Sequence, residues 1–257
     1  MKLTFLGTGS ALPTGTRFQT GLLVRAGENS LLVDCGSGVL HGLASTDVGY
    51  EGVETVLLTH HHLDHVSDLP VLMKARWLAG EESLTIVGPT GTQKLISGLL
   101  DVHEYMQDRL DLTVRDIEPA KTPVTLEGFD VSAMWTRHSM DCLAYRFERG
   151  ADEPAFAFSG DSEAFVKLVE FANEAAVFVH DCSFPDEVDV SNHPTPAQLG
   201  QTLAAADADI GRVYLTHLYP HTDGKHEEML ASLHEHYEGD VRFASDGLTL
   251  DVTAVGD

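Results

Sequence analysis

Short apolar runs that end in polar turns recur along this chain. Near the N-terminus, residues 2–7, 21–26 and 30–36 have this pattern and are joined by glycine-containing turns, which predicts three short strands. We expect a further strand in each later apolar run: 55–60, 84–89, 129–138, 143–149, 155–161, 176–182, 212–217 and 247–253. The apolar pattern therefore predicts a chain rich in strands.

Helical spacing appears between some of these strands. Residues 162–175 predict an amphipathic helix, because four apolar residues recur there at i, i+3, i+4 and i+7: Phe165, Leu168, Val169 and Ala172. We also expect helices in 90–106, from Pro196 onwards, and in 225–239. A first run of strands followed by mixed strands and helices predicts an α/β fold with helices packed outside the sheets.

The composition is that of a soluble globular protein. The chain has 257 residues, 43% of them apolar, and no run approaches the roughly 18 apolar residues of a membrane span. Its opening residues lack the apolar segment and cleavage site of a signal peptide, so we expect a cytoplasmic protein. Cys35, Cys142 and Cys182 are too dispersed for a zinc-thiolate site and are expected to be buried and reduced.

The charge is strongly acidic, with 40 acidic against 16 basic residues and a formal net charge of −24. Such a charge either repels polyanionic partners or reflects a very salty cytoplasm, where the Debye length is only about 3 Å at 1 M salt. We favour the salty cytoplasm, that is, a halophilic protein. The acidity then does not exclude a nucleic-acid substrate, although no basic patch argues for one.

Residues 57–68, "LLTHHHLDHVSD", place four histidines and two aspartates behind an apolar run. A histidine after a strand is more often structural, but four His and Asp side chains within six residues indicate a metal site. Further candidates follow other predicted strands, at the sheet edge where α/β folds gather ligands. Nitrogen and oxygen ligands without thiolate suit Zn²⁺, and also Mn²⁺ or Fe²⁺. The candidates are His60, His62, Asp64, His65, His138, Asp161 and His217.

These motifs together resemble the metallo-β-lactamase superfamily, and within it the ribonuclease Z-like branch. The resemblance covers nearly the full length and rests on "FLGTGSALPT", "LLVDCGSG", "THHHLDH", "RHS", "SGDS" and "LTHL". It implies an αββα sandwich, in which two mixed β-sheets are flanked by helices, and two divalent metal ions per chain, zinc first. We expect one domain over 1–257, because the chemical residues come from the whole length, and by resemblance a homodimer.

The resemblance also assigns the ligands. His60, His62 and His138 would hold one metal, and Asp64, His65 and His217 the other, with Asp161 bridging both. Asp64 would also orient or deprotonate the attacking water. His61 falls on a variable position of the signature and is excluded. The other histidines that match no ligand motif are expected on the surface or in packing: His103, His221, His226, His234 and His236.

Two later segments, "VHDCSF" and "NHPTPAQLG", also resemble ribonuclease Z motifs. Asp181 stands where the family has glutamate, and Pro194 where it has serine. Thr195, Pro196 and Gln198 make a helix N-cap, first position and capping-box partner, which explains Thr195 without catalysis. By resemblance, His193 protonates the leaving alkoxide with help from Asp181, and we expect His193 to project from a loop instead of packing inside.

The spacing between the motifs narrows the choice among ribonuclease Z-like enzymes. The interval from His138 to Asp161 holds two predicted strands and a turn at 148–154, where long-form ribonuclease Z enzymes carry a tRNA-gripping arm; this chain has no such arm. The leading hypothesis is therefore a dinuclear metal phosphodiesterase that hydrolyses RNA without a tRNA arm. Small phosphodiesters such as cyclic nucleotides are the alternative substrates. A non-catalytic metal- or ligand-binding protein is the alternative of another class, although nothing in it would require Asp64.

Overall fold

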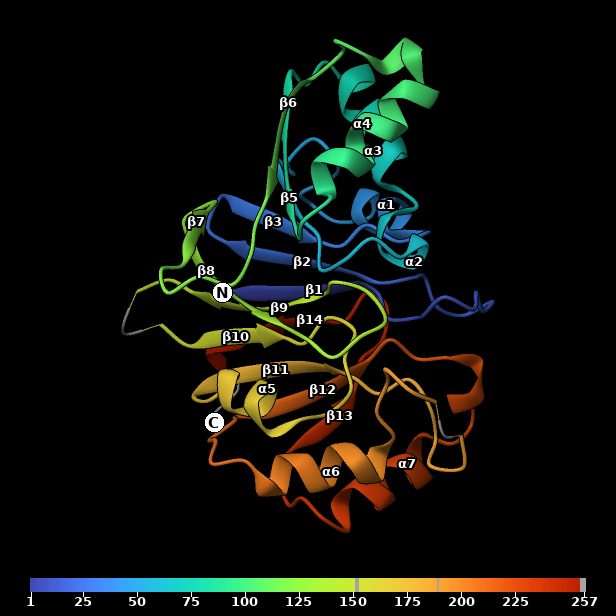
Figure 1. Cartoon of the computed structure of the whole chain (residues 1–257), viewed down its shortest axis with the longest axis vertical. Helices are drawn as coiled ribbons and strands as arrows, with labels where there is room; N and C mark the ends of the chain where they lie inside the picture. Colours follow the sequence, from blue (N-terminus) through green and yellow to red (C-terminus); the bar gives the residue numbers. More distant parts are fainter. Residues whose placement is uncertain (151–152, 189, 255–257) are drawn as a thin grey trace.

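Two seven-stranded sheets face each other in the computed structural model, which describes residues 1–150, 153–188 and 190–254 (Figure 1). The strand orders are β14-β1-β2-β3-β4-β5-β6 and β13-β12-β11-β10-β9-β8-β7. Helices α1–α4 lie outside the first sheet and α5–α7 outside the second (Figure 1). This arrangement is the predicted αββα sandwich of two mixed sheets flanked by helices, so the predicted fold class is confirmed.

The first half of the chain and one C-terminal strand form the first sheet and the helices that cover it. Its strands are β1 (Lys2–Gly7), β2 (Gly21–Ala26), β3 (Asn29–Val33), β4 (Thr55–Leu57), β5 (Ser83–Gly88), β6 (Asp111–Asp116) and β14 (Thr249–Asp251). Its helices are α1 (Val39–Ala44), α2 (Leu63–Val66), α3 (Leu69–Ala79) and α4 (Thr92–Val102).

The second half of the chain forms the second sheet and its helices. Its strands are β7 (Val124–Leu126), β8 (Phe129–Trp135), β9 (Leu143–Glu148), β10 (Ala155–Phe158), β11 (Ala175–Asp181), β12 (Arg212–Thr216) and β13 (Val241–Phe243). Its helices are α5 (Val166–Phe171), α6 (Pro196–Ala205) and α7 (His226–His234), and short 3₁₀ turns lie at Glu104–Met106, Pro220–Thr222 and Val252–Ala254.

Both sheets change from antiparallel to parallel pairing. β14 and β1 to β3 pair antiparallel, whereas β3 to β6 pair parallel. In the other sheet, β7 to β10 pair antiparallel and β10 to β13 parallel. Parallel strands end at one edge, so the loops after β4, β10, β11 and β12 are brought together.

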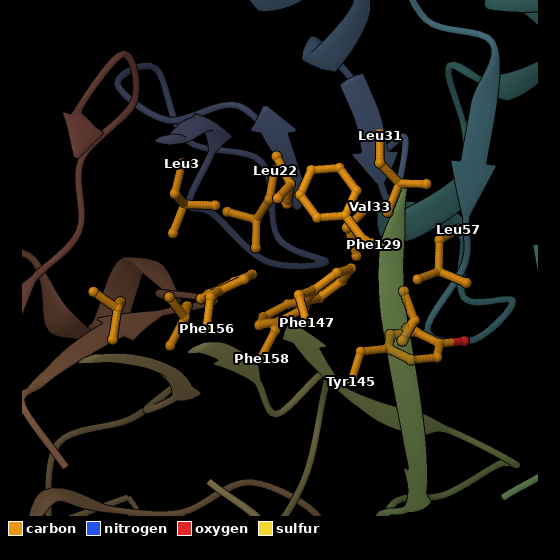
Figure 2. Packing of buried hydrophobic residues seen from close by; sticks show 14 of the residues in the cluster. Leu3, Leu22, Leu31, Val33, Leu57, Phe129, Tyr145, Phe147, Phe156 and Phe158 are labelled. Atoms are coloured by element: carbon orange, nitrogen blue, oxygen red, sulfur yellow. The ribbon is translucent and has the colours of Figure 1, made fainter. Parts of the chain in front are cut away.

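The core between the sheets is rich in aromatic residues. Phe5, Phe129, Phe147 and Phe156 are fully buried there, and Figure 2 shows several of these rings beside Leu3, Leu22 and other leucines. The rings of Phe147 and Phe156 stack with centroids 5.2 Å apart. Each such side chain contributes on the order of 2–3 kcal/mol by leaving water. This packing fixes the two sheets against each other and thereby the loops at their common edge.

Several predicted elements are confirmed and some need correction. The helix predicted at 162–175 is wrong in extent, because α5 begins only at Val166. Phe165 is extended, with φ −153°, and the amide of Glu163 donates to the carbonyl oxygen of Arg137, so these residues serve the edge loops instead of a helix. α4 ends at Val102, short of the predicted Met106.

The remaining expectations concern the cysteines, one predicted turn, membrane spans and the number of domains. The three cysteines are free and buried, as predicted. Residues 151 and 152 of the turn predicted at 148–154 lie outside the described residues. In the part of the chain that the structure describes, every helix is too short or too polar to cross a membrane. The single domain over 1–257 stays a prediction.

Candidate metal centre

All seven candidate ligands lie at one edge of the two sheets. His60 follows β4, and α2 begins directly after His62, which places Asp64 and His65 in its single turn. His138, Asp161 and His217 follow β8, β10 and β12 in the facing sheet. The ligand atoms fall into overlapping groups that could each hold a metal ion, including one of His60, His62, His138 and Asp161 and one of Asp64, His65 and His217.

The ligand atoms of the first group lie close enough together to share one ion. His62 Nδ1 lies 2.9 Å from His60 Nε2 and 3.1 Å from His138 Nε2. Asp161 Oδ2 lies 3.6 Å from His60 Nε2 and 3.8 Å from His138 Nε2. Zinc–nitrogen bonds of about 2.0–2.1 Å in a tetrahedron separate ligand atoms by roughly 3.3 Å. The four side chains therefore fit one Zn²⁺-sized ion.

The second group shares Asp161 with the first. His217 Nε2 lies 3.1 Å from Asp64 Oδ2 and 3.2 Å from Asp161 Oδ2, while His65 Nε2 lies 3.3 Å from Asp161 Oδ1. His65 Nε2 is buried and has no hydrogen-bond partner among the described residues. An orphaned buried nitrogen that faces two carboxylates is what a bound cation would satisfy. The residues present thus fit two metal ions with Asp161 between them.

The charges of the site suit ligation. Burial, together with the neighbouring histidines, lowers the pKa of His60 well below its usual value, and burial also lowers the pKa values of His62 and His138. These imidazoles keep a free lone pair at neutral pH. Burial opposes ionisation of Asp161, but His217, His65 and His60 hold the pKa of Asp161 well below its usual range. Burial opposes protonation of His65, but Asp161 and Asp34 raise the pKa of His65 well above its usual value, so a bound cation would take the place of its proton. Imidazole nitrogens and a carboxylate are ordinary zinc ligands.

Asp34 is a functional residue that the sequence analysis did not single out. Its Oδ2 accepts a hydrogen bond from His65 Nδ1 at 2.7 Å, and its Oδ1 accepts one from the amide of Thr59 at 2.7 Å. Asp34 thereby fixes the tautomer of His65 and aims Nε2 at the metal position. The available signal was the motif "LLVDCGSG", in which this buried acid directly follows β3.

Ser183 is a second residue that the sequence analysis did not single out. Its hydroxyl donates to Asp181 Oδ1 at 2.6 Å and lies 2.8 Å from His217 Nδ1, which can donate to it. Ser183 is fully buried, so these bonds orient the imidazole of His217 and couple it to Asp181. The available signal was its place in "VHDCSF", two residues after Asp181.

His193 lies in the loop before α6, but its side chain is only 10% exposed. The expectation that it would project without packing inside is therefore wrong. Its ring stacks on that of His217, with centroids 5.2 Å apart, and its Nδ1 lies 2.7 Å from Asp181 Oδ2. The shorter aspartate thus reaches His193. Burial opposes protonation, but the charge of Asp181 raises the pKa of His193 to about 9.

The N-terminal cap of α6 lies two residues after His193. Thr195 and Gln198 form the predicted capping box, with the amide of Thr195 donating to Gln198 Oε1 at 3.0 Å. Pro196 occupies the first turn of the helix, also as predicted. The chain enters this cap directly from the loop that carries His193, so the cap fixes the end of that loop.

The histidines set aside at the sequence level lie outside the two groups. His61 turns its Nε2 to Thr92 Oγ1, at 2.8 Å. His226 stacks on Phe243, with ring centroids 4.0 Å apart. The other four histidines in this set are exposed or half-buried, as expected: His103, His221, His234 and His236.

Comparisons with known proteins agree with this fold. Residues 1–229 match the family described as Anti-Pycsar protein Apyc1. Ribonuclease Z of Mycobacterium avium is 31% identical, over 96% of each chain, and ribonuclease Z of Haloferax volcanii is 27% identical, over 98% of this chain and 95% of that one.

Solved structures give the same result. The metallo-β-lactamase fold protein YhfI from Bacillus subtilis matches with a TM-score of 0.82 and 26% identity, over 97% of this chain and 99% of that chain. Human tRNase Z, short form, matches with a TM-score of 0.80 at 21% identity over 98% and 99%, which supports the fold. The chain therefore belongs to the family described as Anti-Pycsar protein Apyc1, in the ribonuclease Z-like branch of the metal-dependent hydrolases with the metallo-β-lactamase fold.

Proposed function

We propose that this chain is a dinuclear, zinc-dependent phosphodiesterase that hydrolyses RNA. The observation that carries the proposal is the position of Asp161, whose carboxylate contacts ligand atoms of both histidine groups. RNA is favoured because relatives that align over nearly the full length are named ribonuclease Z. The predicted homodimer and cytoplasmic location belong to the same proposal.

The proposed ligands are those of the two groups. His60, His62 and His138 would hold one ion, Asp64, His65 and His217 the other, and Asp161 both. Two divalent ions in such a site lower the pKa of a shared water and neutralise charge on the attacked and leaving oxygens. Asp64 has one oxygen beside His217 and a second oxygen to orient that water and accept its proton.

His193 and Asp181 would act on the leaving group. Because His193 Nδ1 is hydrogen-bonded to Asp181 Oδ2, the other ring nitrogen, Nε2, is left to give a proton to the departing alkoxide. The stacking of His193 on His217 places this proton donor beside the proposed metal positions. Asp181 is fully buried and is also held by Ser183, so it keeps the imidazole in one orientation.

Hydrolysis of cyclic nucleotides is the second candidate. The match to the Anti-Pycsar family favours it, since that family points to cyclic nucleotides. The short connections between β8, β9 and β10 favour it too, because intervals of this length leave no room for an arm that would grip a large RNA. The two candidates share the metal site and the proton donor and differ only in what surrounds the phosphodiester.

Metal analysis and a substrate panel test the proposal together. We expect about two zinc ions per chain and cleavage of a short unstructured RNA faster than that of 2′,3′- or 3′,5′-cyclic nucleotides, at matched salt and metal. Asp161→Ala should lose most of the metal and the activity, because this carboxylate contacts both groups. Retention of both metals in Asp161→Ala would contradict the bridging role, and two bound metals without turnover of any diester would favour a binding protein.

A further inference from the structure

A cavity of about 370 Å³ adjoins the candidate metal centre on the side of His193. It lies between α6 and the segment before it, and His193 is one of its walls. The ring of His193 is 5.3 Å from that of His138 and 5.2 Å from that of His217, measured between centroids. His193 is therefore shared by the cavity and the metal centre, and a group bound in the cavity would be separated from the centre by this one ring.

The lining offers uncharged hydrogen-bonding groups. Gln198 spends its Oε1 on the amide of Thr195, which leaves its Nε2 as a donor. Gln201 has its Nε2 3.3 Å from His236 Nε2, which leaves its Oε1 as an acceptor. Thr202 donates its hydroxyl hydrogen to the carbonyl oxygen of Gln198 and can still accept. Donors and acceptors of this kind recognise hydroxyl and amide groups.

The charge of the lining is negative. Glu163 contributes a carboxylate, of which Oε1 accepts from the amide of Asn192 at 3.3 Å. Among the described residues that line the cavity there is no lysine, arginine or aromatic residue besides His193. A second phosphate would be repelled by Glu163, and a quaternary ammonium group would lack the aromatic faces that such groups favour. The lining suits a neutral group that carries donors.

We propose that this cavity binds the nucleoside joined to the phosphodiester under attack, with Glu163 and Gln201 as specificity-determining residues. Sugar hydroxyls or base N–H groups would donate to Glu163 and to Gln201 Oε1. The volume lies within the range of small-molecule sites, about 300–1,000 Å³, and suits one nucleoside. This inference rests on the proposed phosphodiesterase function and names the part of the substrate that the enzyme selects.

Three chromogenic diesters with the same nitrophenolate leaving group test the inference with the metal-loaded protein. The three diesters differ in the group on the other side of the phosphate, which is thymidine joined through its 5′ oxygen, a second nitrophenyl group or choline. We expect the wild type to favour the thymidine ester over bis(4-nitrophenyl) phosphate. Glu163→Gln and Gln201→Ala should each reduce that kcat/KM preference by about tenfold through KM, the order of magnitude expected when one hydrogen bond to a substrate is lost. Glu170→Gln on α5 and Gln93→Ala on α4, both exposed, are matched controls and should keep it.

Direct binding separates this inference from the proposed function. Calorimetry with thymidine, which has no phosphate, should detect binding to the wild type and to both controls, and binding about tenfold weaker to the two cavity variants. If thymidine binds in this way but no diester is cleaved, the phosphodiesterase proposal fails and the nucleoside site stands. An unchanged preference and unchanged thymidine binding in both cavity variants would overturn the nucleoside site, as would a wild-type preference for the phosphocholine ester that Glu163→Gln abolishes.

Discussion

His193 is held from three sides at the edge of the metal centre. Asp181 accepts a hydrogen bond from its Nδ1, His217 stacks on one face, and Phe184 meets the ring from another direction at 6.0 Å between centroids. Asp181 is in turn bonded to Ser183. A side chain fixed in this way loses little freedom when it donates a proton, so its contribution to catalysis should exceed its contribution to metal binding.

We predict that His193→Ala keeps both metals and the fold but lowers turnover by roughly 10²–10⁴-fold, the usual range for a general acid. The loss should be much smaller for a nitrophenyl ester, because nitrophenolate leaves without protonation. Metal content, thermal unfolding and kcat on both substrates are the measurements, with His234→Ala on the exposed end of α7 as the control. An equal loss on both substrates would instead assign His193 to substrate positioning or to structure.

At the scale of single residues, the sequence located the side chains that follow a recognisable spacing. His60, His62, Asp64 and His65 are close in sequence, so their proximity follows from one strand and one helical turn. The partners that orient them are different. Asp34 and Ser183 reach His65 and His217 only after β3 has paired with β4 and β11 with β12, and their roles depend on distances of 2.7 and 2.8 Å that the motifs alone do not give.

The connections between β8, β9 and β10 determine what the protein can grip. β8 ends at Trp135, β9 spans Leu143–Glu148 and β10 begins at Ala155, so only short segments separate them. His138 occupies the first of these segments. A long arm inserted here would bind a large RNA at a distance from the metals, and segments of this length are too short to form such an arm.

We therefore predict no strong preference for a folded tRNA precursor over an unstructured RNA of the same 3′ sequence. The expected result is less than about a tenfold difference in kcat/KM when the two compete at equal ionic strength, because both present the same short segment to the site. A labelled mixture of the two RNAs measures this directly. A large preference for the tRNA precursor would mean that another surface grips it.

Elements were predictable where the apolar pattern was clean. β10 reads "AFAF" and is buried throughout, and β12 is nearly so. α3 was not predicted, because Val71 and Leu78 are apolar yet 51% and 67% exposed, which blurs the spacing of the buried Leu69, Leu72 and Met73. β6 alternates between half-buried and exposed residues at the end of its sheet, so its pattern is weak and depends on pairing with β5.

At the scale of the whole molecule, most of the negative charge has no nearby basic partner. Of the 40 acidic residues, five carboxylates pair with lysine or arginine within the described part of the chain: Asp47, Glu81, Glu148, Glu187 and Asp240. Surface pairs of this kind contribute at most about 1 kcal/mol each. The self-repulsion of the remaining carboxylates therefore opposes the compact state unless salt screens it.

We predict that the protein is folded and active at molar KCl and loses stability in dilute buffer. The Debye length grows from about 3 Å at 1 M to about 30 Å at 0.01 M, so repulsion between carboxylates on neighbouring loops is restored as salt is removed. Thermal unfolding of the metal-loaded protein along a KCl series should show a midpoint that rises steadily with salt. Sucrose in dilute buffer is the control, since it favours burial without screening charge and should recover only part of the loss. Equal stability at both ends of the KCl series would show that the negative charge is too dispersed to destabilise the fold, and the acidic surface would then have no bearing on the salt of the host.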